Sequence, residues 1–599
     1  MQRNLFVRLG LAAALLAGAP LAAQTADEAS AFITETEREL GELNLRANQA
    51  AWTAANFITV DTEAMSAEAQ KNLAVAIQRR ALAARRFDAV QLPAEQRRKL
   101  NVLKLSLTAP PPGNTDEAVE LTRTQVSMEA DYGRGEYCRP GGGECLDVGE
   151  ITRIMAMSRN AAELLDVWQG WHRVGAPMRD RYARFVELSN KGARELGHPS
   201  TGAMWRSQYE MHPDSFALEV DRLWAQVRPL YESLHAYVRT RLVEQYGPQV
   251  VDPDGMIPAH LLGNIWAQEW GNIYPLVAPR NAAGTGYDLT ELIRARNLDA
   301  VQMTRFGERF FTSLGFDSLP ATFWERSLLT QPRDREVVCH ASAWNVDDAD
   351  DLRIKMCIEP TGEDFVTIHH ELGHSFYQRA YKNQPPLFRN GAHDGFHEAI
   401  GDAIALAITP EYLVQAGLLD RAPAAAADTA LLLRQAMDKV AFLPFGLLVD
   451  KWRWGVFSGE IPPSRYNAAW WELRNRYQGI AAPVARSEAD FDPGAKYHIP
   501  GNTPYMRYFL ARVLQFQFYR ALCREAGYTG PLHRCTFYGS EAAGARLERM
   551  LEAGMSQPWQ QTLYEMTGER RMDAGAMMEY FAPLKAWLDR QNQGKPVSW

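Results

Sequence analysis

The stretch VTIHHELGHSFYQ, at residues 366–378, places two histidines four positions apart. On an α-helix, His370 and His374 project from the same face one turn apart, so both imidazole rings can reach one metal ion. The same helix carries an apolar stripe on roughly the opposite face, formed by Ile368, Leu372 and Phe376. This combination predicts a helix that packs against a core through one face and binds zinc through the other.

Glu371 lies between these two histidines, three residues before His374. Its carboxylate is placed beside the metal without being a ligand, where it can take a proton from zinc-bound water as general base. The neighbouring His369 falls between the two helix faces, and we interpret it as a structural residue. The motif alone indicates metal-assisted hydrolysis and leaves the substrate open.

A catalytic zinc needs a third protein ligand and an open position for water. Glu398 and Asp402, in the stretch DGFHEAIGDAIALAI, share one helix face, with isoleucines on the opposite face. We expect Glu398 to be the third ligand, and Asp402 to accept a hydrogen bond from a ligating imidazole and so orient it. The adjacent His397 is the alternative ligand.

The rest of the chain predicts one large helical unit. Of the 599 residues, 46% are hydrophobic and 23% are charged, which is typical of a globular protein. Helical spacing of apolar residues recurs along the chain, whereas residues 335–344, REVVCHASAW, are the best strand candidate. The net charge of -8 and the interspersed basic residues argue against nucleic acid as a partner.

The N-terminus is similar to a secretory signal peptide. Two arginines precede an apolar run that begins at Leu9, and small residues follow around Ala22 and Ala23. We expect a signal peptide over residues 1–23 and export of the remaining chain without a membrane anchor. The alternative is an uncleaved anchor, for which the apolar run is short.

An even number of cysteines in an exported chain suggests disulfides. The six cysteines occur as sequence neighbours, Cys138 with Cys145, Cys339 with Cys357, and Cys523 with Cys535. Many pairings are possible, and short loops favour the neighbours.

Several blocks together resemble the angiotensin-converting enzyme family of zinc peptidyl-dipeptidases. The resemblance rests on HHELGH at 369–374 and GFHEAIGDAIALA at 395–407. It continues in family order from about residue 160 to the C-terminus, through PAHLLGNIWAQEWGNIY at 258–274, REVVCHASAW at 335–344, WWELRNRYQGI at 470–480 and FDPGAKYHIPGNTPYMRYFLARVLQFQFYRALC at 491–523.

The resemblance implies a mainly α-helical gluzincin fold with a deep central cleft between two lobes. Residues 24–599 would form a single catalytic domain of a soluble, bacterial-type member. Within it, the N-terminal helices at about 25–105 would act as a lid over the cleft. The resemblance also implies one zinc ion per chain.

Further site residues follow from the resemblance. Tyr508 and His498 match a tyrosine and a histidine that stabilise the tetrahedral intermediate, and both can donate hydrogen bonds to a developing oxyanion. Gln268, Lys496 and Tyr505 match the residues that hold the C-terminal carboxylate of the substrate, through one positive charge and two directional donors. Anchored roughly 7 Å from the zinc, such a cluster would measure off two extended residues.

Other matched positions line the substrate path. His340 and Ala341 match a segment that pairs with the substrate backbone. Phe442 would line the pocket for the last side chain, with core packing as the alternative. The three neighbouring cysteine pairs match disulfides of the family.

The match is weaker at the chloride sites of the family. One site uses a tyrosine and an arginine, matched by Tyr209 and Arg507, and we expect one chloride ion there. The other uses two arginines and a tryptophan. Trp470 and Arg474 are present, but the remaining position is His172, with an arginine one residue later. We do not expect chloride at this second site, and any activation by chloride should be weaker or absent.

Together these features predict a zinc-dependent dipeptidyl carboxypeptidase, exported to a periplasm or out of the cell. Its partners would be oligopeptides with a free C-terminus. One alternative is a carboxypeptidase that removes a single residue, against which the retained Gln268 argues. The other is a catalytically silent peptide-binding homologue, against which the intact zinc motif argues.

Overall fold

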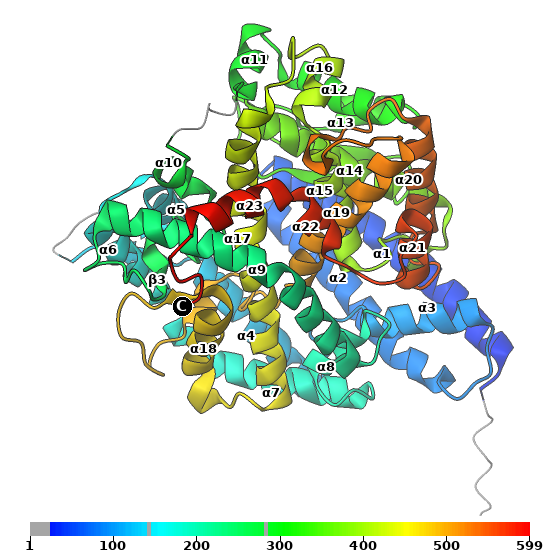
Figure 1. Ribbon diagram of the computed structural model, residues 1–599. Helices are drawn as coiled ribbons and strands as arrows, with labels where there is room; N and C mark the ends of the chain where they lie inside the picture. The colour runs from blue at the N-terminus through cyan, green and yellow to red at the C-terminus, as the bar shows by residue number, and fades with distance from the viewer. Residues whose placement is uncertain (1–23, 141–144, 281–285) are drawn as a thin grey trace, which may run out of the picture.

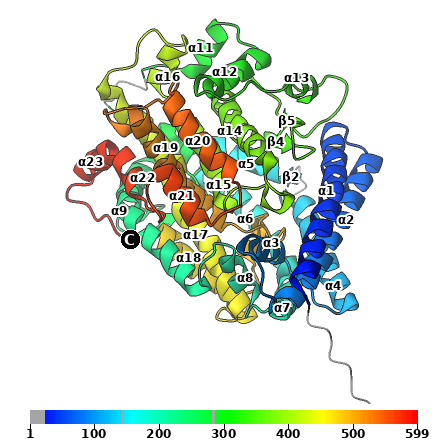
Figure 2. The same cartoon turned by 90° about the vertical axis from the view of Figure 1, so that its right-hand side faces the viewer.

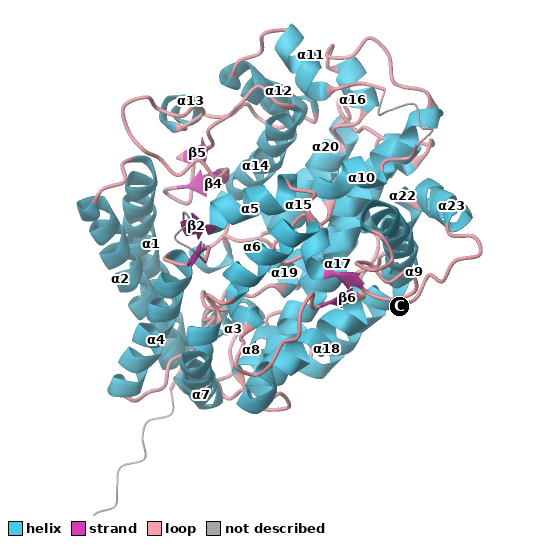
Figure 3. Ribbon diagram, turned by 90° about the vertical axis from the view of Figure 1, so that its left-hand side faces the viewer, coloured by secondary structure: helices cyan, strands magenta, loops and turns pink. Residues whose placement is uncertain are grey.

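The computed structural model describes residues 24–140, 145–280 and 286–599 and is mainly α-helical, which confirms the predicted fold class (Figure 1). The strands are short and lie at separate points among the helices (Figure 3). The predicted signal peptide, at residues 1–23, lies outside the described residues. Within the described ranges, no helix is long and apolar enough to cross a membrane.

The first three helices, α1 (Ala26–Asn56), α2 (Val60–Ala84) and α3 (Ala94–Leu105), have a hydrophobic core of their own. The helices α1 and α2 lie side by side along one edge of the molecule (Figure 2). The core that α1, α2 and α3 share consists of Ala29, Phe32, Ile33, Ala81, Ala84, Phe87, Leu100 and Leu103. These helices occupy the range predicted to form a lid, and that role stays a prediction.

The remaining helices pack around a second, larger core. The first of them are α4 (Thr115–Gly133), α5 (Val148–Met157), α6 (Ala161–His172), α7 (Arg179–Glu195), α8 (Thr201–Ser207), α9 (Pro213–Tyr246), α10 (Tyr274–Val277), α11 (Leu289–Ala295), α12 (Ala300–Ser313) and α13 (Ala321–Arg326). They are followed by α14 (Gly362–Ala380), α15 (Asp394–Leu406), α16 (Pro410–Gln415), α17 (Asp428–Ser458), α18 (Tyr466–Gln478), α19 (Met506–Glu525), α20 (Glu541–Ala553), α21 (Trp559–Thr567), α22 (Gly575–Tyr580) and α23 (Ala582–Gln591). The contacts of α15 with α14 and α19 position the site described below.

Six short strands form three two-stranded sheets within the described part of the chain. They are β1 (Glu136–Cys138) with β2 (Cys145–Asp147), β3 (Ile257–Pro258) with β6 (Ile480–Ala481), and β4 (Ser342–Asn345) with β5 (Leu352–Lys355). The strand expected at residues 335–344 therefore begins only at Ser342. The Cys339–Cys357 disulfide closes the open end of the β4–β5 hairpin, and the pairs Cys138–Cys145 and Cys523–Cys535 also form as predicted.

The helices α14 and α15 approach each other closely because glycines face one another where they meet. A Cβ atom added to Gly373 would lie 2.9 Å from Cα of Gly401, and one added to Gly401 would lie 2.8 Å from Nδ1 of His370. Real Cβ atoms do not approach neighbours so closely, because protein interiors are already close-packed. The absence of both side chains thus sets how near α15 can come to the histidines of α14.

We expect Gly401→Ala to destabilise the protein by about 1–3 kcal/mol, because the added methyl group must displace the His370 ring or separate the two helices. Chemical denaturation of the metal-free protein measures the change. Gly41→Ala in α1 is the matched control, since nothing lies within 4 Å of its added Cβ. That change should stabilise the protein by about 0.5–1 kcal/mol. Unchanged stability of Gly401→Ala would contradict a close approach of α14 and α15.

Candidate metal centre and active site

Two helices bring the predicted zinc ligands together. His370 and His374 lie on α14 with their Nε2 atoms 3.1 Å apart, and Oε2 of Glu398 on α15 lies 3.7 Å from Nε2 of His370. One ligand atom from each of the three residues falls within 4.8 Å of the others. Two nitrogens bound to one zinc at about 2.0–2.1 Å lie about 3.3 Å apart in tetrahedral geometry. The donor types and their spacing therefore fit zinc.

Asp402, which we expect to orient a ligating imidazole, lies behind His370. Its Oδ1 is 3.4 Å from Nδ1 of His370, so the carboxylate can hold Nδ1–H and leave Nε2 for the metal. The other oxygen accepts hydrogen bonds from Arg512 (2.5 Å) and Gln515 (3.1 Å) on α19. Sequence reasoning missed both of these residues, although they lie one turn and two turns after Tyr508 on the same helix.

His397 is not part of the convergent group, so the alternative ligand is not supported. Its Nδ1 lies 3.3 Å from Nδ1 of His374, and its Nε2 lies 3.2 Å from the Tyr381 hydroxyl. Burial lowers the pKa of His397 to about 4, so the ring is neutral at pH 7. His397 therefore contacts the far side of a proposed ligand, as Asp402 does for His370.

His369 is a structural residue, as expected. It is fully buried, its Nδ1 lies 2.7 Å from the Phe365 carbonyl oxygen, and its Nε2 lies 3.1 Å from the Tyr412 hydroxyl. Both ring nitrogens are thus occupied within the core. Glu371, two positions later, is 7% exposed, and burial raises the pKa of its carboxyl group.

The predicted oxyanion donors lie close to each other at the start of α19. The His498 ring is 5.7 Å from the Tyr508 ring, and both rings pack against Tyr505. Burial lowers the pKa of His498 to about 2, so the imidazole is neutral. Its buried Nδ1 has no hydrogen-bond partner among the described residues. A buried polar atom without a partner costs free energy, which is typical of a group that binds something else.

The predicted carboxylate-binding residues meet although Gln268 is more than 200 positions from Lys496 and Tyr505 in the chain. Nζ of Lys496 donates to Oε1 of Gln268 at 2.7 Å, and the Tyr505 hydroxyl donates to the same oxygen at 3.4 Å. Burial lowers the pKa of Lys496 to about 7. The carboxylate of Glu269 acts on the same lysine in the opposite direction and raises its pKa. The cluster therefore carries donors and a positive charge suited to a carboxylate.

The backbone before Gln268 is strained. Ala267 has a φ of 51°, in the left-handed region that non-glycine residues rarely adopt. Its carbonyl oxygen accepts hydrogen bonds from Gln478 (3.1 Å) and Trp270 (3.4 Å), which hold this conformation. The strained conformation sets the direction of the Gln268 side chain. Residue 267 is an alanine, so no glycine or asparagine at this position signals the conformation in the sequence.

Of the other predicted substrate-binding residues, Phe442 lies beside Tyr505, and His340 is close enough to Glu371 to lower the pKa of that carboxyl group. His340 is exposed, and its Nδ1 lies 2.9 Å from the Ala341 carbonyl oxygen just before β4. Phe442, on α17, is 5% exposed, with its ring 5.9 Å from the Tyr505 ring. This position is compatible both with a pocket wall and with the core packing that we kept as the alternative.

The residues matched to the second chloride site of the family make contacts with other residues of the protein. Arg474 donates to Oε1 of Gln478 (2.9 Å) and to the Trp266 carbonyl oxygen (2.6 Å), while Trp470 is buried. Burial lowers the pKa of His172 to about 4, so the site lacks a second positive charge at that position. The next residue in sequence, an arginine, is exposed. Whether chloride binds here stays a prediction.

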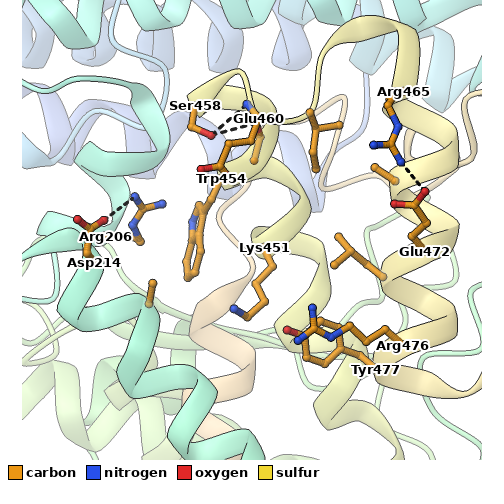
Figure 4. Close-up of a pocket in the computed structure, with 15 residues that line it drawn as sticks. Arg206, Asp214, Lys451, Trp454, Ser458, Glu460, Arg465, Glu472, Arg476 and Tyr477 are labelled. Carbon is orange, nitrogen blue, oxygen red and sulfur yellow. Dashed lines mark hydrogen bonds and ion pairs between the residues drawn. The ribbon is translucent and has the colours of Figure 1, made fainter.

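A cavity of about 600 Å³ lies elsewhere, between α8, α9, α17 and α18 (Figure 4). Its walls carry both signs of charge together with the Trp454 and Tyr477 rings. The charges largely pair with one another, as Arg465 does with Glu472. None of the site residues predicted from the sequence lines this cavity, so we do not assign it to the reaction.

The family model described as angiotensin-converting enzyme, peptidase M2, matches residues 23–599. The chain belongs to the angiotensin-converting enzyme family. Rat angiotensin-converting enzyme is 50% identical over 481 residues, which cover 79% of this chain and 36% of the rat protein. Angiotensin-converting enzyme of Theromyzon tessulatum is 38% identical over 590 residues, which cover 96% of this chain and 95% of that protein. The mouse angiotensin-converting enzyme-like protein Ace3 is 43% identical over 492 residues, which cover 81% of this chain and 66% of the mouse protein. The chain thus spans about a third of the rat member of the family.

Asp402→Asn should lower the affinity for zinc about 10- to 100-fold, because the amide does not stabilise the liganding form of His370 as the carboxylate does. Competition with a fluorescent chelator measures the affinity without an activity assay. Asp428→Asn is the matched control, since Asp428 is also largely buried and paired with an arginine, Arg534 at 2.5 Å, but lies outside the centre. If both variants bound zinc like the parent protein, Asp402 would have no role at the metal.

Proposed function

We propose that this protein is a zinc-dependent dipeptidyl carboxypeptidase that releases dipeptides from the free C-termini of oligopeptides. The observation that carries the proposal is the contact of Lys496 and Tyr505 with Gln268, beside the His498 and Tyr508 pair. Gln268 is distant in sequence from the other four residues, and its contact with Lys496 and Tyr505 supports a carboxylate-binding cluster next to oxyanion donors. Membership of the angiotensin-converting enzyme family supports the same reaction.

The proposed zinc site is formed by His370, His374 and Glu398. When bound there, zinc lowers the pKa of a coordinated water and polarises the scissile carbonyl. Glu371 removes the proton from the attacking water and then delivers it to the leaving amine nitrogen, as general base and then general acid. Its partly apolar surroundings suit both roles, because they raise the pKa of the carboxyl group.

Tyr508 and His498 act on the other side of the reacting carbon. Each donates a hydrogen bond to the oxygen that gains negative charge as water attacks. The neutral state of His498 leaves one ring N–H for this purpose. The unpartnered Nδ1 of that ring supports the assignment, because the substrate would supply its missing contact.

Substrate selection depends on the C-terminus of the peptide. Lys496 provides the charge that pairs with the terminal carboxylate, and Gln268 and Tyr505 orient it. His340 and Ala341 pair with the peptide backbone, and Phe442 contacts the last side chain. The N-terminal helices act as a lid that admits flexible peptides and excludes folded proteins.

The disulfides support the proposed location, and the proposed reaction determines the cofactor. The three disulfides are typical of an oxidising compartment, in agreement with export to a periplasm or out of the cell. The proposed reaction requires one zinc ion per chain. The chloride ion expected between Tyr209 and Arg507 is untested, and the Asp394 carboxylate lies against the Arg507 guanidinium at that place.

Product analysis tests the proposal. A defined oligopeptide with a free C-terminus, incubated with the zinc-loaded protein, should yield dipeptides by mass spectrometry, and the same peptide with an amidated C-terminus should be a poor substrate. Glu371→Gln should bind zinc normally and lose about 100-fold or more in kcat, because the base is removed. Glu363→Gln, an exposed glutamate on the same helix, should retain full activity.

Each alternative function has a distinct outcome. Release of single amino acids would indicate a carboxypeptidase that removes one residue. Binding of the peptide without any zinc-dependent cleavage would indicate a silent homologue. Wild-type activity in Glu371→Gln would show that another group is the base.

The charge of Lys496 predicts a pH dependence of kcat/KM. Burial lowers the pKa of this lysine to about 7, so half of the molecules carry the ammonium form near pH 7, and this form increases at lower pH and is lost as the pH rises. We expect kcat/KM to fall by about 10- to 100-fold above neutrality, the value of one charge-assisted hydrogen bond. Lys496→Arg remains charged throughout. A fall of the same size in this variant would assign the pH dependence to another group.

A further inference from the structure

The pair of residues expected to bind chloride has a carboxylate against it. Asp394 places Oδ2 3.3 Å from Nε of Arg507, and the Tyr209 side chain interacts with the same carboxylate. Both carboxylate oxygens and Nε of Arg507 are buried, and by geometry none of the three makes a hydrogen bond with the described residues, so the contact between Asp394 and Arg507 is an ion pair. The chain therefore supplies an anion of its own where a chloride ion is expected.

Asp394 is ionised at neutral pH. Burial alone would raise the pKa of its carboxyl group, but Arg507, His393 and Tyr209 hold the pKa below its usual range. Asp394 also lies in the first turn of α15, where the helix dipole favours a negative charge. A chloride ion at the same place would be repelled by this carboxylate at close range. The Asp394 carboxylate thus supplies one negative charge at this site, and it disfavours the binding of a chloride ion there.

The ion pair joins the two helices that carry the proposed catalytic groups. Asp394 lies one turn before the zinc ligand Glu398 on α15, and Arg507 directly precedes Tyr508 on α19. The two helix starts touch, since a Cβ atom added to Gly395 would lie 3.3 Å from the Arg507 carbonyl oxygen. Fixing the Arg507 side chain therefore fixes the start of α19 relative to the metal.

We propose that Asp394 is a positioning residue that acts as the internal anion of this site, holding Arg507 and through it Tyr508, so that the reaction needs no chloride. The proposal rests on the peptidase function proposed above. Asp394 touches neither zinc nor the scissile bond, and its effect on the rate is transmitted through α19.

Halide rescue tests this proposal. The parent protein is assayed with chloride up to about 0.5 M, replaced by acetate to keep the ionic strength constant, since salt alone screens charges. Its kcat/KM should change less than about 2-fold. Asp394→Asn keeps the side-chain shape and loses the charge, so its kcat/KM without halide should fall at least about 10-fold. Chloride or bromide should restore most of this loss by occupying the vacated position.

A matched control separates this effect from a general loss of surface charge. Asp214 also lies in the first turn of a helix, α9, near an arginine, Arg206 at 3.9 Å, but its side chain is 80% exposed. Asp214→Asn should show the activity of the parent protein and no halide response. Thermal unfolding of each variant shows whether it is folded under the assay conditions.

Chloride binding gives a readout that does not depend on activity. In ³⁵Cl NMR of the zinc-loaded proteins, Asp394→Asn should broaden the chloride line more than the parent protein does. Activation of the parent protein by chloride, or full activity of Asp394→Asn without halide, would overturn the proposal. Equal line broadening in both proteins would overturn it as well. Absence of peptidase activity in the parent protein would instead refute the proposed function, while the NMR comparison still tests the internal anion.

Discussion

The short distance between α14 and α15 is the constraint on which the metal centre depends. Neither Gly373 nor Gly401 carries a side chain where the helices meet, so His370 from one helix and Glu398 from the other approach the same point. The close approach also buries polar groups, and each of them needs a partner. Asp402 provides that partner for His370. Its second oxygen binds α19, so three helices, rather than two, determine the shape of the centre.

Local sequence patterns sufficed to predict the parts of the site that belong to one helix. The histidines of α14 were found because a four-residue spacing fixes their common face, whatever surrounds the helix. Glu398 and Asp402 were found for the same reason, with the apolar positions of α15 marking the opposite face. The mainly helical fold and the neighbouring disulfides were equally accessible. In each case the physical determinant lies within a short stretch of sequence, of which the longest is the 18 positions between Cys339 and Cys357.

Such local patterns could not predict contacts between segments that are distant in sequence. The meeting of Gln268 with Lys496 was predicted only through family resemblance, because no periodicity links residues 268 and 496. Arg512 was missed, since its role follows from where α19 crosses α15. The sequence does not single out Asp394, because acidic residues are favoured in the first turn of any helix. Only its distance from Arg507 distinguishes it, and that distance is a property of the fold.

The separate core of α1, α2 and α3 has a consequence for motion. The buried apolar side chains of these helices pack mainly against one another and not into the larger core. The contacts that cross to the rest of the molecule are both polar and aromatic, for example the hydrogen bond from Asn44 to Asp348 and the contact of the Trp52 and Trp344 rings. If these helices act as the predicted lid, opening would break those boundary contacts and leave the larger core packed. The rate at which a peptide reaches the proposed zinc site would then depend on that boundary, while the residues of the site stay in place.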